Sequence, residues 1–183
     1  MSVIKFGAWQ DLSGNEVANS SDPVGDGGLV LIKSQTIGTA VSSVTVSDVF
    51  SSAFDNYLIT LNGGTMSSDT TLKMQLGSLT TGYYQTVIFS SFAGAGVSTD
   101  QYSNSSSWIY GGGGGARPTS YITLFNPYTT YNTQGQARVR YSTVYGQSQL
   151  YVDDEGTSHS SFTFIPYTGT ISGSVIRVYG YRN

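Results

Sequence analysis

The chain has 183 residues, which is enough for one domain with a sizeable core, because a chain of this length buries about 70% of its unfolded surface. Only 10% of the residues are charged, against about 25% in ordinary soluble domains, so uncharged polar residues must provide solubility. The net charge of −3 argues against a nucleic-acid partner. The chain has no apolar run of about 18 residues, which argues against a membrane span. The absence of cysteine excludes disulfides and thiolate metal sites.

The first 28 residues differ in pattern from the rest of the chain. They hold a short apolar stretch that includes Ile4, Phe6 and Trp9, then a turn at residues 13–15, and then the breaker-rich sequence SSDPVGDGG. We therefore place a boundary after residue 28. The expected organisation is an extended N-terminal arm, residues 1–28, followed by a β domain, residues 29–183.

From residue 29 onward, short segments alternate between apolar and polar residues, and turns separate them. Tyr (14 copies) and Gly (23 copies) are commoner than a helical composition allows. Alternation is clear around residues 29–38, 44–50, 72–76, 136–145 and 162–167, and further strands are expected at 57–62, 83–92, 119–125 and 174–181. Such alternation leaves one face buried and one face wet, which is typical of antiparallel sheets. The predicted fold is an all-β, antiparallel β-sandwich of eight or nine strands, jelly-roll-like in architecture.

Residues 110–119, YGGGGGARPT, contain five consecutive glycines, which lose much conformational entropy when they are ordered. The favoured expectation is a flexible surface loop, and the alternative is a loop held by something outside the domain. A phosphate-binding loop is excluded, because no Lys-Ser/Thr pair and no helix follow the glycines.

The residues that could carry out catalysis are few. His159 is the only histidine, no GxSxG sequence is present, and we expect His159 in a loop or at a strand edge. The acidic run at Asp153, Asp154 and Glu155 lacks the spacing of a calcium loop, so we interpret it as a solvated turn. The sequence predicts no catalytic residues, no metal site and no cofactor. A glycan-depolymerising enzyme that uses Asp153 or Glu155 is the least favoured alternative.

A binding surface is the remaining possibility for function, since Tyr, Ser, Gly and Asn are common in adaptable binding surfaces. Residues 98–118 are expected to form a ligand-binding loop that presents Tyr102, Trp108, Tyr110 and Arg117. Aromatic faces of this kind can stack on sugar rings. The competing interpretation is that many of the tyrosines are half-buried strand residues, and the sequence leaves both open.

Four stretches resemble virion proteins of marine bacteriophages and cyanophages. The opening MSVIK with WQDLSGNEV resembles the leader of their tail-fibre proteins, and residues 27–64 resemble the start of a β-sandwich module in them. TLFNPY at 123–128 and IRVYGYRN at 176–183 are similar to later landmarks of that module. The resemblance covers nearly the whole chain, but its landmarks are strand and turn patterns.

The resemblance implies a non-enzymatic virion protein that is made in the host cytoplasm and resides on the phage tail or capsid surface. It implies a homotrimeric tail-fibre or receptor-binding element whose arm docks on other virion proteins through Ile4, Phe6 and Trp9, with a host surface glycan as a further partner. Because a leader joined to one module leaves no room for a shaft, a capsid decoration protein is the alternative. No nucleic-acid partner and no membrane insertion are expected.

Overall fold

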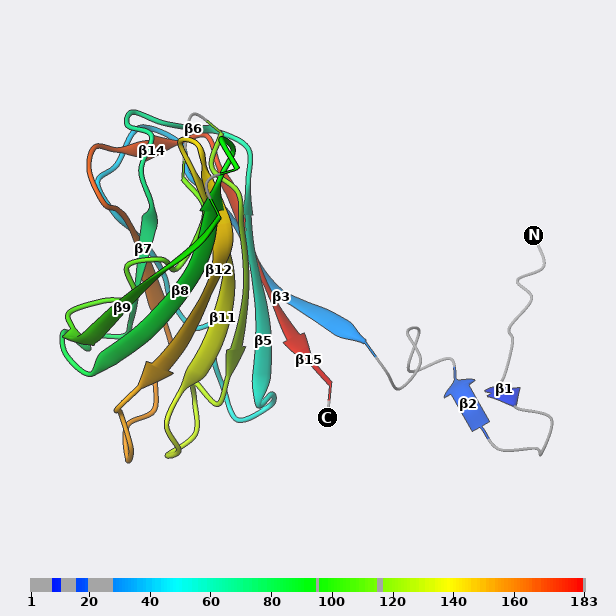
Figure 1. Cartoon of the computed structure of the whole chain (residues 1–183). Coiled ribbons are helices and arrows are strands. Elements are labelled where there is room, and N and C mark those ends of the chain that lie inside the picture. Colours follow the sequence, from blue (N-terminus) through cyan, green and yellow to red (C-terminus); the bar gives the residue numbers. More distant parts are fainter. Residues whose placement is uncertain (1–7, 11–15, 20–27, 95, 115–116, 183) are drawn as a thin grey trace, which may run out of the picture.

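The structure, a computed structural model, describes residues 8–10, 16–19, 28–94, 96–114 and 117–182. Within these ranges the regular elements are β-strands and no helix is present (Figure 1). The strand pairs of this part of the chain are antiparallel. The prediction of an all-β, antiparallel sandwich is therefore confirmed, while the jelly-roll-like architecture and the N-terminal arm stay predictions.

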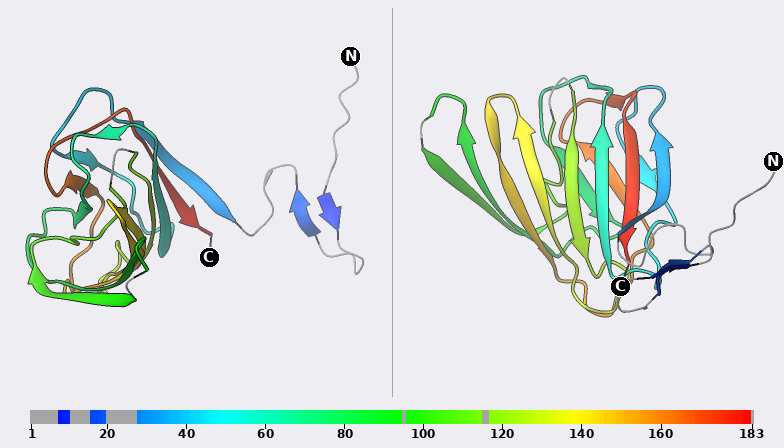
Figure 2. Two further views of the ribbon diagram at one scale, coloured as in Figure 1. Left: turned by 45° about the horizontal axis from the view of Figure 1, so that its top comes forward. Right: turned by 90° about the vertical axis from the view of Figure 1, so that its right-hand side faces the viewer.

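The larger layer, called the large sheet, has eight strands in the described part of the chain. Their order across the sheet is β3 (Leu29–Thr36), β15 (Val175–Tyr181), β5 (Asn56–Asn62), β10 (Ser120–Phe125), β11 (Gln134–Tyr141), β12 (Val144–Val152), β8 (Tyr83–Ser91) and β9 (Val97–Ser105). The right-hand view of Figure 2 shows these strands side by side. β15 lies between β3 and β5, so the last strand of the chain is held inside the sheet.

A second layer, called the small sheet, packs against one face of the large sheet. It consists of β4 (Val44–Val46), β13 (Phe162–Pro166) and β7 (Leu72–Leu76). Two short strands, β6 (Thr65–Met66) and β14 (Ile171–Ser172), pair with each other, as do β1 (Ala8–Gln10) and β2 (Glu16–Asn19).

The core lies between the two layers. Large-sheet side chains at positions 59, 61, 122, 124 and 176 meet small-sheet side chains at positions 72, 74, 76, 162 and 164, and all of them are at most 1% exposed. The small-sheet positions are the apolar positions of the alternating segments 72–76 and 162–167, so the sequence pattern identified the buried face of these two strands correctly. Burial of this apolar surface supplies the main driving force for pairing the layers.

Two strands of the large sheet, β9 and β12, were not predicted from the sequence, and neither were the short strands β1, β2, β6 and β14. Most side chains of β9 are exposed and polar, because β9 is an edge strand that has a partner on one side only among the described residues. The stretch expected as one strand over 136–145 instead contains the turn between β11 and β12. Ser142 adopts a φ of 49° there, and its amide donates to the Asp69 carboxylate at 2.8 Å, a long-range contact that has no local sequence signal.

The segment that leads to the glycines extends the small sheet. Met74 and Trp108 exchange two backbone hydrogen bonds of 2.9 Å each, so residues around Trp108 lie along the free edge of β7. Trp108 is 0% exposed, and its indole Nε1 donates to Ser148 Oγ at 2.7 Å. Tyr110 joins Val87 and Val139 in a second, smaller apolar cluster.

The glycines at 111–114 are buried, so the expectation of a flexible surface loop is wrong for these residues. A Cβ on Gly111 would lie 2.7 Å from Met74 Cβ, and one on Gly114 would lie 1.2 Å from the carbonyl oxygen of Thr70. The glycines are required because the backbone passes directly against β7 and its neighbours. Close packing therefore orders this stretch and outweighs its entropic cost.

Candidate binding site

The solvent side of the large sheet, called the outer face, carries the candidate site. The small sheet covers only the opposite side, and strand alternation turns every second side chain of β8, β11 and β12 outward. Several outward aromatic rings remain exposed, among them Tyr84, Tyr121, Tyr145 and Tyr151 at 38–49%. Rings that are left exposed next to one another on a sheet mark a surface suited to contact with a ligand or partner.

The register of the strands sets the outward side chains in rows. One row contains Arg138, Gln147 and Ile88, and the next row contains Arg140, Tyr145 and Ser90. Residues in a row come from three neighbouring strands, about 4.8 Å apart. The two rows therefore form one contiguous patch with the arginines on β11 at one end, and with Ile88 of β8 and Val97 of the adjacent β9 at the other.

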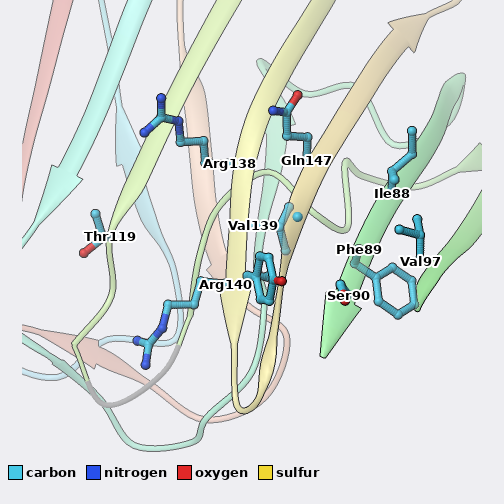
Figure 3. Close-up of a pocket in the computed structure, with 11 residues that line it drawn as sticks. Ile88, Phe89, Ser90, Val97, Thr119, Arg138, Val139, Arg140 and Gln147 are labelled. Atoms are coloured by element: carbon cyan, nitrogen blue, oxygen red, sulfur yellow. The ribbon is translucent and has the colours of Figure 1, made fainter. Parts of the chain in front are cut away.

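A groove of about 870 Å³ runs over this patch. In Figure 3, Arg138 and Arg140 lie on β11 on the same side of the groove as Thr119, and Ile88 and Val97 lie on the opposite side. Val97 at 73% and Ile88 at 53% are the more exposed of its apolar residues. The groove thus has a cationic end and an apolar end.

The electrostatics of the groove are one-sided. The outward positions of β8, β11 and β12 contain no Asp or Glu, and in the described part of the chain neither Arg138 nor Arg140 forms an ion pair. The Arg138 guanidinium lies 5.3 Å from the ring centroid of Tyr121, a cation–π contact that keeps the charge on the outer face. The carboxylate of Asp100, from neighbouring β9, accepts a hydrogen bond from the Tyr110 hydroxyl at 3.1 Å.

An aromatic contact fixes one ring that lines the groove. Tyr145 stacks on Phe92, with 5.5 Å between ring centroids. Outside the groove, farther along the same two strands, Tyr84 meets Tyr151 edge to face at 6.2 Å. Tyr145 is nevertheless 49% exposed, so one part of its ring is available to a ligand. A rigid, exposed ring beside unpaired guanidinium groups can provide stacking, hydrogen bonding and charge recognition together.

The four residues predicted for a ligand-binding loop differ in their exposure to solvent. Trp108 and Tyr110 are 0% and 6% exposed, so the prediction that they present a ligand-binding surface is wrong. Their rings are large apolar groups that fill the space under the large sheet. Tyr102 is half-buried against Tyr110, with 5.9 Å between centroids, and Arg117 is exposed. The structure does not gather these four side chains into one site.

The predicted docking residues lie in the first part of the chain. Ile4 and Phe6 lie outside the described residues, and Trp9 lies in β1, where its backbone pairs with Ala18 of β2. Their role in docking stays a prediction.

The acidic run is only partly a solvated turn. Asp153 and Glu155 are exposed, whereas Asp154 is 4% exposed and pairs with the equally buried His159, with Nε2 2.8 Å from Oδ2. The Thr133 amide and hydroxyl also donate to the Asp154 carboxylate, each at 2.8 Å. The expectations of a solvated Asp154 and of an exposed loop or edge position for His159 are therefore wrong. A buried carboxylate is tolerated because its oxygens are satisfied by these donors.

The dyad of His159 and Asp154 lies after β12, and the hydrogen bonds from Thr133 to Asp154 tie it to the chain before β11. Burial alone would raise the pKa of Asp154, but the hydrogen bonds from His159 and Thr133 outweigh burial and lower the pKa below its ordinary value. Among the described residues no serine or threonine hydroxyl is hydrogen-bonded to His159, so the dyad has no paired nucleophile. Its contacts support a structural role.

Among the described residues there is no group of three or more His, Asp or Glu side chains that could hold a metal ion. The same part of the chain contains no helix long and apolar enough to cross a membrane.

The groove on the outer face was not predicted from the sequence, although the pattern of β11 indicates where its two arginines point. The alternation of Arg138 and Arg140 with Ala137 and Val139 places both arginines on the wet face of one strand. The neighbours of that strand, and hence Tyr145 and Ile88, could not be assigned without the strand order.

Comparisons with known proteins identify no relative of this chain. No protein-family model, no curated protein and no solved structure matches the chain.

Proposed function

We propose that the protein is a structural component of a bacteriophage particle that acts by binding rather than by catalysis, with the outer face of the large sheet as its contact surface. The observation that carries the proposal is the groove of about 870 Å³ on that face, with exposed rings and with two arginines that form no ion pair among the described residues. Concave surfaces with apolar lining and a few well-placed polar groups are typical of ligand sites.

The particle context rests on the resemblance of residues 27–64, 123–128 and 176–183 to virion β-sandwich modules. In this proposal the protein is a tail-fibre or receptor-binding element that is made in the host cytoplasm and resides on the virion. Residues 1–28 attach it to other virion proteins, with Ile4, Phe6 and Trp9 as anchors, because aromatic and large apolar side chains dominate small interfaces. The outer face is then free to meet the host surface.

A capsid decoration protein is the second candidate, and one observation favours it. Leu29 and Leu31 of β3 are 43% and 52% exposed at the edge of the large sheet, directly after the segment proposed to dock. Exposed apolar residues next to a free strand edge are suited to contact with a neighbouring protein subunit.

The test of attachment is incorporation into particles. A chain with Ile4, Phe6 and Trp9 all changed to alanine should fold but be lost from purified particles. A matched chain with Asp11, Ser13 and Asn15 changed to alanine should be retained. Equal retention of both chains would contradict docking through the apolar anchors.

The position of the protein on the particle, tail or capsid, is tested by labelling. Antibody labelling of intact particles should mark the tail, and purified tailless capsids should carry no label. Many copies on tailless capsids would establish the decoration alternative instead. Absence from both parts of the particle would overturn the proposed function.

A further inference from the structure

We propose that the groove on the outer face binds acidic polysaccharide chains, with Arg138 and Arg140 pairing with sulfate or carboxylate substituents and Tyr145 packing against a sugar ring. This inference deepens the proposed function and rests on it for the biological setting. It concerns a ligand class for a site whose residues the sequence did not single out.

The arginine pair has the geometry of an anion-recognition site. Arg138 and Arg140 are two residues apart on β11, so their Cα atoms lie about 7 Å apart and their side chains leave the same face of the sheet. In Figure 3 both guanidinium ends extend to the side on which Thr119 lies. A guanidinium group binds a planar or tetrahedral oxyanion through two parallel hydrogen bonds.

The surroundings leave these charges available to a ligand. No carboxylate occupies an outward position of β8, β11 or β12, and no described carboxylate pairs with either arginine. Two like charges held near each other repel, and an anionic ligand relieves that repulsion. The protein as a whole carries a charge of −3, so the groove differs in sign from the average surface.

The remaining groups fit a carbohydrate. Gln147 and Thr119 line the groove and offer neutral donors and acceptors for sugar hydroxyls, while the Ser90 hydroxyl, which donates to the Gly96 carbonyl at 2.8 Å, offers an acceptor. Tyr145 offers an exposed ring face, fixed by stacking on Phe92. The residues that line the groove come from several neighbouring strands, so the groove crosses the sheet and suits a segment of a long chain.

Nucleic acid fits these observations less well. A protein that holds a polyphosphate backbone typically neutralises about 6–10 phosphates, whereas the groove supplies two arginines and the net charge is −3. An acidic polysaccharide carries a few anionic groups among many hydroxyls. This composition matches the groove, which places two arginines among neutral amide and hydroxyl groups.

The experiment compares ligands that share one backbone. Binding of the full chain to dextran, carboxymethyl-dextran and dextran sulfate is measured by isothermal titration calorimetry, with single-stranded oligothymidine as the nucleic-acid arm. We expect binding to both acidic dextrans and at least tenfold weaker binding to dextran and to oligothymidine. Raising the salt from about 0.05 M to about 0.5 M should weaken binding to the acidic dextrans, since the arginines are solvent-exposed.

Variants assign the binding to the groove. The double variant Arg138→Gln and Arg140→Gln should lose about tenfold or more in affinity for dextran sulfate, and Tyr145→Ser should weaken binding to both acidic dextrans. Arg177→Gln is the matched control, because Arg177 lies on the same face of the same sheet, on β15, three strands from β11. It should change affinity less than twofold. Circular dichroism of each variant confirms that the fold is retained.

Three results would overturn the inference. They are equal affinity for dextran and dextran sulfate, equal losses in the Arg177 control and the groove variant, and tighter binding to oligothymidine than to the acidic dextrans. These outcomes are separate from failure of the proposed function. A chain found nowhere on the particle would defeat that function even if dextran sulfate bound, and a virion protein that binds neutral glycans would defeat only the inference.

Discussion

A Cβ atom on Gly114 would lie 1.2 Å from the carbonyl oxygen of Thr70, a distance that no local adjustment of a side chain can relieve. We therefore expect Gly114→Ala to lower the free energy of unfolding by about 1–3 kcal/mol or more, because the backbone itself must move. Urea unfolding followed by tryptophan fluorescence measures the change.

Gly38 provides the matched control for that substitution. A Cβ on Gly38 would have nothing within 4 Å. Gly38→Ala should change the free energy of unfolding by less than about 0.5 kcal/mol. If both substitutions had the same small effect, the glycines at 111–114 would not be packed as described.

The lowered pKa of Asp154 implies that the free energy of unfolding depends on pH. Its pKa is lowered in the folded state, so the unfolded chain binds a proton at this position at higher pH than the folded chain does. The stabilisation is present in full above the ordinary pKa of 3.8 and is lost as the pH falls through the lower folded value. Asp154→Asn should lower stability at neutral pH by about 1–3 kcal/mol, since the amide cannot replace the carboxylate for all its donors.

The measurement is urea unfolding at a series of pH values from about 7 down to about 2. The Asp154→Asn chain should show a shallower loss of stability with acid than the unchanged chain. Asp153→Asn, at the exposed neighbouring position, should keep the steep profile. Parallel profiles for the unchanged and Asp154→Asn chains would contradict the role assigned to the dyad.

At the scale of elements, the segment around Trp108 acts as an additional strand of the small sheet. The Met74 and Trp108 amides each donate to the other residue's carbonyl at 2.9 Å, beneath the large sheet. Hydrogen exchange should therefore protect both amides as strongly as those of β13. The amide of Thr39, in an exposed loop, serves as the fast-exchanging reference. Rapid exchange at Trp108 would mean that the segment opens independently of the core.

Strand periodicity was readable for elements with one apolar face, such as β7 and β13, because each buries every second side chain. It failed for β9, whose edge position leaves most of its side chains exposed, and at the turn of Ser142, which depends on distant Asp69. The candidate groove could not be predicted from single strands. It exists because β11, β12 and β8 are neighbours in space, while β8 lies more than 40 residues before β11 in the chain.

At the scale of the whole molecule, the homotrimer that the resemblance to virion proteins implies has a direct test. The low charge of the chain and its exposed rings permit extensive polar and aromatic contact between copies. Sedimentation equilibrium of the full chain should give three times the 19.5 kDa chain mass. A mass that stays at one chain at micromolar concentration would contradict the trimer and leave the fold unaffected.

The all-β class, the antiparallel sheets and the buried faces of most strands were determined by the sequence alone, because period-two alternation is a local property that each strand carries by itself. The tertiary structure decided which strands are neighbours, that Trp108 and four glycines are packed inside, and that Asp154 meets His159. Those outcomes depend on contacts between distant residues. These contacts stabilise the fold only when the two layers pack together and exclude water, so no short stretch of sequence encodes them.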